Sequence, residues 1–260
     1  MKKIVFFDID GTLWDEEMQI PETTKIAIKK LREHGHKAFL CSGRAKANIC
    51  DPKLMELNFD GIIAACGNHV EMNGKILHEN ILSLETVRLI YDVTRKYHLP
   101  IVLEGPKKQW LDEEGFEGDS YITYIKSLKD TSVMLREFSE DIYVNKFSAL
   151  IGPQTNYEAV KEALLPMFDF LEHGQGVVEM IPKGTSKATG IAWLCDYLGI
   201  ANEDTYAVGD SVNDLDMLQF VGHGIAMGNA SDIAKQSAEY VTTSLEEDGI
   251  YHALEHYGLI

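Results

Sequence analysis

Two aspartates that could hold a metal ion follow the first apolar segment of the chain. They belong to the motif Asp8–Thr12 (DIDGT), which ends the apolar run Lys3–Ile9, a pattern typical of a buried parallel strand. Alternation along a strand sends Asp8 and Asp10 to the same side. Two carboxylates that close repel each other unless a cation or a shared proton lies between them, and hard oxygen ligands favour Mg²⁺. The alternative for this motif alone is a polar turn after a strand.

A second acidic motif has the same position relative to a strand. Gly209–Asp214 (GDSVND) follows the apolar run Tyr206–Val208. Capping of a helix N-terminus is the alternative explanation, but it accounts for only one or two of Asp210, Asn213 and Asp214. In an open α/β sheet, ligands bind beyond the carboxyl ends of the strands, so we expect both acidic motifs at one site.

A possible phosphate seat and a lysine complete the set of candidate residues. Ser42, Gly43 and Arg44 follow the predicted strand Lys37–Cys41, and a hydroxyl with backbone N–H groups at the start of a helix binds phosphate. Lys187 stands in the first turn of a predicted helix, where a positive charge is mildly unfavourable. We therefore expect Lys187 to have a functional role, with a solvated surface lysine as the alternative.

The elements around these motifs predict a parallel sheet. Strands Lys3–Ile9, Lys37–Cys41 and Gly61–Cys66 alternate with helical segments from Pro21 to Gly35 and from Ala45 to Leu57. Strand–helix alternation at this spacing predicts parallel strands joined by right-handed crossovers. The motifs that follow the strands would then meet at one edge of the sheet.

The alternation stops after the third strand. Val70–Leu77 is a hairpin signal with Asn73-Gly74 as a type I′ turn, and the acidic, glycine-rich stretch Asp112–Asp119 predicts an exposed loop. The other elements predicted in this block are helices Ser83–His98 and Asp119–Leu128 and strands Pro100–Leu103, Tyr143–Ile151 and Val177–Ile181. We interpret the block as a second, α+β domain inserted into the first.

The alternating pattern resumes near Gly184. The predicted elements are helices Thr185–Leu198, Asp214–Phe220 and Ala230–Gln236 and strands Thr205–Val208, Gly224–Met227 and Tyr240–Thr242. The chain is therefore expected to divide into a split core, residues 1–82 and 184–260, around an inserted domain at 83–183.

Composition excludes several classes of partner. The chain has 260 residues, 24 of them basic and 41 acidic, with a formal net charge of −17. Nucleic-acid binding needs a basic face, and anionic membrane surfaces repel such a chain, so we expect no nucleic acid and no membrane partner. Asp8 interrupts the first apolar run too early for a signal peptide, and the four cysteines lack metal-site spacing. A cytoplasmic location is expected.

In their order and content, the four motifs resemble those of the haloacid dehalogenase superfamily of phosphotransferases. Asp8–Thr12 matches the first motif, Ser42 the second, Lys187 the third and Gly209–Asp214 the fourth. The resemblance covers nearly the whole chain.

The inserted block looks like the cap of the Cof-type, class IIB members. The resemblance therefore implies an α/β fold: a Rossmann-like, doubly wound parallel sheet core with an inserted α+β cap domain. One departure from the family pattern is Cys66–His69 (CGNH), where many members have Asn-Gly-Ala. Within it, His69 either faces the site or packs as an ordinary core residue.

The resemblance implies a role for each motif. Asp8 would be the nucleophile that forms an aspartyl-phosphate. Asp10 would protonate the leaving oxygen and then take a proton from water, and Thr12 is expected to orient Asp10. Lys187 is the third catalytic residue and, with Ser42, would hold the phosphoryl oxygens.

The resemblance also implies the ligands of Mg²⁺ and of the phosphate. The metal would be held by Asp8, the Asp10 carbonyl and Asp210, with Asp214 as a further ligand or acting through its neighbours. Gly11, Thr12, Ser42, Gly43 and Asn213 are the expected phosphate-binding residues.

The predicted function is a Mg²⁺-dependent phosphatase that hydrolyses a small phosphorylated metabolite, with a sugar phosphate as the expected substrate. Two alternatives stay open. A phosphomutase or phosphotransferase would return the phosphoryl group to a sugar, and a catalytically weak regulatory protein would bind phosphorylated ligands with little turnover.

Overall fold

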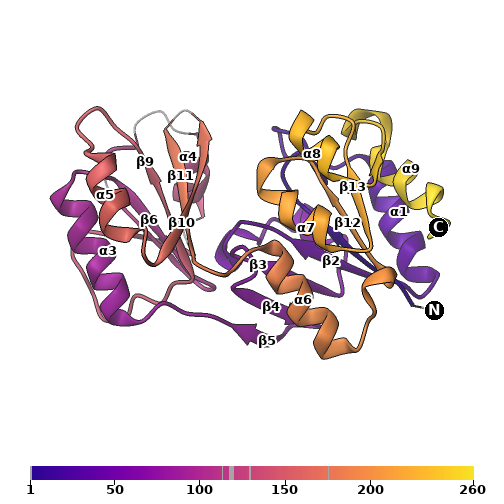
Figure 1. Ribbon diagram of the computed structural model, residues 1–260, viewed down its shortest axis with the longest axis horizontal. Coiled ribbons are helices and arrows are strands. Elements are labelled where there is room, and N and C mark those ends of the chain that lie inside the picture. The colour runs from indigo at the N-terminus through magenta and orange to yellow at the C-terminus, as the bar shows by residue number, and fades with distance from the viewer. Residues whose placement is uncertain (1, 113, 117–119, 129, 175) are drawn as a thin grey trace. The chain divides into compact units, whose positions relative to one another are not determined.

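A computed structural model describes residues 2–112, 114–116, 120–128, 130–174 and 176–260 (Figure 1). The chain forms two compact units. Unit 1 comprises Met1–Gly43, Asp51–Glu79 and Thr185–Ile260, and unit 2 comprises Arg44–Cys50 and Asn80–Gly184. The sequence predicts an inserted domain at 83–183 and does not anticipate that Arg44–Cys50 groups with it.

Unit 1 is built on a sheet whose described strands run in the order β14-β13-β12-β1-β2-β3-β4-β5. From β14 to β3 neighbouring strands are parallel, and the hairpin β4–β5 adds an antiparallel edge. Their bounds are β1 Ile4–Phe7, β2 Lys37–Cys41, β3 Gly61–Ala64, β4 His69–Met72, β5 Lys75–Glu79, β12 Thr205–Gly209, β13 His223–Ala226 and β14 Tyr240–Val241. Strands β1, β3 and β12 are buried throughout, as expected for a sheet with helices on both faces.

Helices cover the sheet in the doubly wound manner (Figure 1). They are α1 Glu22–Glu33, α2 Pro52–Met55, α6 Lys187–Leu198, α7 Leu215–Phe220, α8 Asp232–Ser237 and α9 Gly249–His256. Helix α1 packs beside α9, whereas α7 packs beside both α6 and α8. The strand order reverses direction between β1 and β12, so their carboxyl ends form the switch point where α/β sheets bind ligands. The predicted α/β fold class is confirmed.

The single helix predicted over Ala45–Leu57 is wrong. The structure has a 3₁₀ turn at Lys46–Asn48 and then the short helix α2, which begins at Pro52. Proline disfavours helical geometry at the residue before it, and Asp51 is extended, with φ −62° and ψ 129°. Its side chain accepts a hydrogen bond from the Lys53 N–H, so Asp51 starts a new helix instead of continuing the old one.

Unit 2 contains a second sheet, in the order β10-β11-β9-β6-β7-β8, and three described helices. The strands are β6 Ile101–Glu104, β7 Gln109–Leu111, β8 Ser132–Met134, β9 Lys146–Leu150, β10 Phe168–Gly174 and β11 Val177–Pro182, and the helices are α3 Leu84–Lys96, α4 Ser120–Ser127 and α5 Tyr157–Leu164. Alternation along β6 puts Ile101 and Leu103 in one apolar cluster, with residues of α3 and α5, and Val102 in another, with residues of α4.

Several elements of unit 2 are absent from the sequence prediction, namely α5, β7, β8 and β10. Strands β7 and β8 have only three residues each, too few for alternation to be visible. The loop predicted as exposed at Asp112–Asp119 is wrong at two described positions, because Asp112 and Phe116 are buried. Residues 113 and 117–119 of that prediction lie outside the described residues.

Within the described residues, no helix is long and apolar enough to cross a bilayer. The four cysteines are free thiols.

Candidate functional site

Three of the predicted acidic residues meet at the carboxyl ends of β1 and β12. The two strands are paired in register, Phe7 beside Val208, and the Asp8 N–H extends the ladder by donating to the Val208 carbonyl at 3.0 Å. Carboxylate oxygens of Asp8, Asp210 and Asp214 all lie within 4.8 Å of one another. Asp8 and Asp214 are buried and Asp210 is half-buried.

Lys187 joins this cluster from a distant part of the chain. Its Nζ donates to Oδ1 of Asp8 and to Oδ1 of Asp214, each at 2.6 Å, and its side chain is only 1% exposed. Lys187 is the first residue of α6, which Ser186 and Thr189 cap in a reciprocal capping box. The alternative of a solvated surface lysine is therefore wrong.

Both carboxylate oxygens of Asp214 accept hydrogen bonds. While Oδ1 accepts from Lys187, Oδ2 accepts the backbone N–H groups of Asp210 and Ser211 at 2.9 and 3.0 Å. A Cβ added at Gly209 would lie 2.6 Å from the Asp214 Cγ, so glycine is required there. Asp214 thus positions Lys187 and the loop that carries Asp210.

In the turn after β1, the hydrogen-bond partners of Thr12 and Asp10 differ from the prediction. The Thr12 hydroxyl donates to Oδ1 of Asp210 at 2.9 Å, so the expectation that it orients Asp10 is wrong. Instead, the indole Nε1–H of Trp14 donates to Oδ1 of the exposed Asp10 at 2.9 Å. Gly11 has φ +77°, and a Cβ there would lie 2.5 Å from Oδ2 of Asp210.

The predicted phosphate residues lie near the same strand ends. Ser42 and Gly43 are buried directly after β2, which pairs with β1 so that Leu40 lies beside Phe7. Asn213 is half-buried, and its Oδ1 accepts from the Ser211 hydroxyl at 2.6 Å.

His69 is a strand residue and not a loop residue. It begins β4, is 1% exposed, and its Nδ1 lies 2.8 Å from Glu79 Oε1 while its Nε2 lies 3.3 Å from Glu71 Oε2. These contacts favour a packing role.

The charges of the site are unbalanced. Burial, with Asp214, Asp210 and Asp10 nearby, raises the pKa of Asp8 well above its usual value, although Lys187 opposes the shift. Burial and Asp214 raise the pKa of Asp210 to about 7. Burial lowers the pKa of Lys187, but Asp214 and Asp8 outweigh it and keep that pKa well above normal. The ammonium group of Lys187 thus contacts two of these carboxylates, and the hard oxygen donors of Asp8, Asp210 and Asp214 suit a divalent cation such as Mg²⁺.

Asn229 was given no role in the sequence analysis. In the structure it connects the turn after β1 to the C-terminal segment of the chain. Its Nδ2 donates to the Gly11 carbonyl at 2.8 Å, and its Oδ1 accepts from the Leu245 N–H at 3.0 Å. Two residues later, the Ser231 N–H donates to the Asp210 carbonyl at 2.9 Å. The position of Asn229 shortly after the predicted strand Gly224–Met227 is the signal that could have suggested it.

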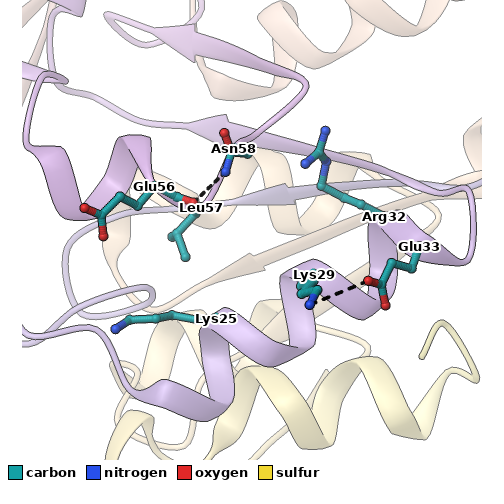
Figure 2. Close-up of a pocket in the computed structure, with 7 residues that line it drawn as sticks. All are labelled: Lys25, Lys29, Arg32, Glu33, Glu56, Leu57 and Asn58. Carbon is teal, nitrogen blue, oxygen red and sulfur yellow. Dashed lines mark hydrogen bonds and ion pairs between the residues drawn. The ribbon is translucent and has the colours of Figure 1, made fainter.

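A pocket of about 560 Å³ lies elsewhere in unit 1, between α1 and the segment after α2 (Figure 2). Lys25, Lys29 and Arg32 contribute positive charge to it. Carboxylates already neighbour these cations, since Lys29 Nζ lies 3.8 Å from Glu33 and Arg32 Nε lies 3.4 Å from Asp60. None of the predicted site residues lines this pocket, so its size does not mark the functional site.

Comparisons with known proteins find one family across nearly the whole chain. A family model described as haloacid dehalogenase-like hydrolase matches residues 5–254. A Bacillus subtilis (strain 168) protein named "Putative phosphatase YkrA" is 32% identical over 260 residues, covering 99% of this chain and 98% of the relative. The 5-amino-6-(5-phospho-D-ribitylamino)uracil phosphatase YitU of the same organism is 29% identical, covering 98% and 97%.

A solved structure has the same fold over its full length. The haloacid dehalogenase subclass IIB sugar phosphatase BT4131 superimposes with a TM-score of 0.84 at 30% identity, covering 100% of both chains.

The unusual pKa of Asp210 predicts a pH dependence of stability. The folded chain keeps a proton on Asp210 up to about pH 7, whereas an aspartate in the unfolded chain loses it near about pH 4. The free energy of unfolding must therefore fall as the pH rises through this window. Asp210→Asn has no such proton but keeps an oxygen for the Thr12 hydroxyl.

Urea unfolding in the presence of a chelator measures this effect. Relative to Asp210→Asn, the wild type should lose about 1–3 kcal/mol of unfolding free energy between about pH 4.5 and about pH 7.5. A difference between the two proteins that stays constant over this range would contradict the assignment.

Proposed function

The chain belongs to the haloacid dehalogenase-like hydrolase family, and from this premise we propose that it is a Mg²⁺-dependent phosphatase acting through an aspartyl-phosphate on Asp8. Its relatives are named phosphatases, which agrees with the enzyme class predicted from the sequence. The observation that carries the proposal is the buried contact of Lys187 with Asp8 and Asp214, because it supports a carboxylate nucleophile beside a fixed positive charge.

Asp8 is suited to attack phosphorus. Lys187 binds its Oδ1, and no side chain or N–H group in the described part of the chain donates to its Oδ2. In the proposed reaction a carboxylate oxygen of Asp8 forms a bond to phosphorus while the bond from phosphorus to the leaving oxygen breaks. Lys187 offsets the negative charge brought by the phosphoryl group.

Asp10 is the proposed acid and base. The Trp14 N–H orients its carboxyl group by donating to Oδ1, and the protonated carboxyl group carries the proton that is transferred. Asp10 gives this proton to the leaving alkoxide. In the second half-reaction it accepts a proton from the water that attacks phosphorus, which releases phosphate and restores the Asp8 carboxylate.

We propose Asp8, the Asp10 carbonyl and Asp210 as the residues that hold Mg²⁺, with Asp214 positioning the loop and Lys187. When bound, the ion supplies positive charge that offsets the carboxylates and the phosphoryl oxygens. Ser42, Gly43, Gly11, Thr12 and Asn213 are proposed to line the phosphate position.

For the substrate we propose a small phosphorylated metabolite of the sugar or sugar-alcohol phosphate class. Two comparisons support this class: BT4131 is described as a sugar phosphatase, and the name of YitU specifies a phosphorylated ribityl chain. The net charge of −17 repels phosphorylated substrates at long range, so affinity for them must come from local contacts. A cytoplasmic location remains a prediction.

Replacing the nucleophile should abolish turnover. We expect Asp8→Asn to lower phosphate release from an aryl phosphate, and from any active member of a sugar phosphate panel, by at least about 10³-fold. The same substitution at exposed Asp232, in the first turn of α8, is the matched control and should leave the rate within about two-fold.

The same assays separate the alternatives. An Asp8→Asn rate equal to that of the wild type would contradict the mechanism. Turnover that requires a sugar bisphosphate activator would favour a phosphomutase, and a folded wild type that releases phosphate from no substrate would favour a binding protein.

Metal removal should act on both activity and stability. Excess chelator should abolish phosphate release, because the carboxylates of the site then face the phosphoryl group without the positive charge of the metal ion. Mg²⁺ should raise the melting temperature more at about pH 8 than at about pH 5.5, since the cation competes with the protons that Asp8 and Asp210 retain. Activity that survives excess chelator would contradict the metal requirement.

A further inference from the structure

The chain leaves β3 through a turn with unusual backbone geometry. Three consecutive residues, Ala65, Cys66 and Gly67, have positive φ values of 51°, 51° and 88°. This conformation suits glycine, but it costs about 1–2 kcal/mol for a residue with a Cβ. Such strain persists only where the surroundings hold it in place, and it gathers at functional sites.

The surroundings of this turn are two parts of the candidate site. The Cys66 N–H donates to the carbonyl of Ser42 at 3.2 Å. On the other side, a Cβ added at Gly67 would lie 2.2 Å from the Ser186 carbonyl oxygen and 3.0 Å from the Gly190 nitrogen. The turn is therefore packed between Ser42, which follows β2 directly, and the first turn of α6, which carries Lys187.

Asn68 fixes the turn to the start of α6. Its side chain is fully buried, and Nδ2 donates to the Ala65 carbonyl at 2.8 Å and to Oγ1 of Thr185 at 3.1 Å. The first bond closes the turn on itself. The second reaches a residue just ahead of Lys187, although the two bonded residues are far apart in sequence.

Thr185 stands at a boundary in the chain. Unit 2 ends at Gly184, and Thr185 is the first residue of the last segment of unit 1. Gly184 has φ +77°, and among the described residues no atom outside Gly184 and its two chain neighbours lies within 4 Å of where its Cβ would be. The backbone can therefore rotate at Gly184 at little cost, whereas the next residue is bonded to Asn68.

We propose that Asn68 is a positioning residue for catalysis: its bond to Thr185 holds the start of α6 so that Lys187 stays on Asp8 when the chain moves at Gly184. The inference rests on the proposed role of Lys187. It gives a function to the position where this chain departs from the family's Asn-Gly-Ala pattern.

Three variants test the bond from both ends. Asn68→Ala removes the donor, Thr185→Val removes the accepting hydroxyl with little change in shape, and Thr185→Ser keeps the hydroxyl. We expect Asn68→Ala and Thr185→Val each to lower kcat by about 10-fold with KM changed by less than about two-fold. The double variant should lose no more than either single variant, and Thr185→Ser should retain the wild-type kcat.

Amide hydrogen exchange of the peptide over residues 184–190 supplies a readout that does not depend on activity. Exchange should be faster than in the wild type in Asn68→Ala and Thr185→Val and unchanged in Thr185→Ser. Asn202→Ala is the matched control, because it also removes an amide-to-carbonyl hydrogen bond, to Phe220, but at the opposite end of β12 from Asp210. It should change neither kcat nor this exchange.

The outcomes separate the two proposals. Unchanged kcat and unchanged exchange in folded Asn68→Ala and Thr185→Val would overturn the positioning role, as would additive losses in the double variant. If the wild type has no phosphatase activity while both variants speed exchange, the proposed function fails and the bond's role in holding α6 stands.

Discussion

The ammonium group of Lys187 lies between Asp8 and Asp214, 2.6 Å from an oxygen of each carboxylate. All three side chains are buried, and removing one member of a buried ion pair typically costs about 3–5 kcal/mol. Lys187 offsets the repulsion between the two acids, and Asp214 in turn holds the backbone of the loop that carries Asp210. The remaining features of the site serve to bring these three groups together.

The fold brings Lys187, Asp8 and Asp214 together because backbone segments of unit 1 pack close to one another. Strands β1 and β12 pair in register, which places two acidic loops at one switch point. Gly11 and Gly209 leave room for the carboxylates of Asp210 and Asp214, and Gly67 lets the turn after β3 touch α6. The amide of Asn229 links the turn after β1 to the C-terminal segment. These contacts thus link the parts of the site within unit 1, and the proposed bond of Asn68 adds the start of α6 to them.

Strand-end motifs were predictable because apolar strands and the residues that follow them are local features of the sequence. Contacts between distant side chains were not. Thr12 donates a hydrogen bond to Asp210 instead of Asp10, and Asn68 donates one to Thr185. The packing of the sheet and α6 sets the distances between these side chains, and those distances cannot be read from the spacing of the residues in the sequence. The helix predicted over Ala45–Leu57 is wrong because Pro52 disfavours helical geometry at Asp51, which is extended. This effect outweighed the apolar periodicity of the segment. Strands β7 and β8 were not predicted because three residues are too few to show an alternation of apolar and polar side chains.

The most direct test of the account is to trap the covalent phosphoryl group. Acid quenching of the enzyme during turnover of a phosphate ester, followed by peptide mass spectrometry, locates any acyl phosphate. We predict a phosphoryl group on the peptide with Asp8, placed on that residue by fragmentation and absent from Asp8→Asn. A phosphoryl group on Asp10 or Asp210, or turnover by the wild type with no covalent phosphoryl group at any quench time, would contradict it.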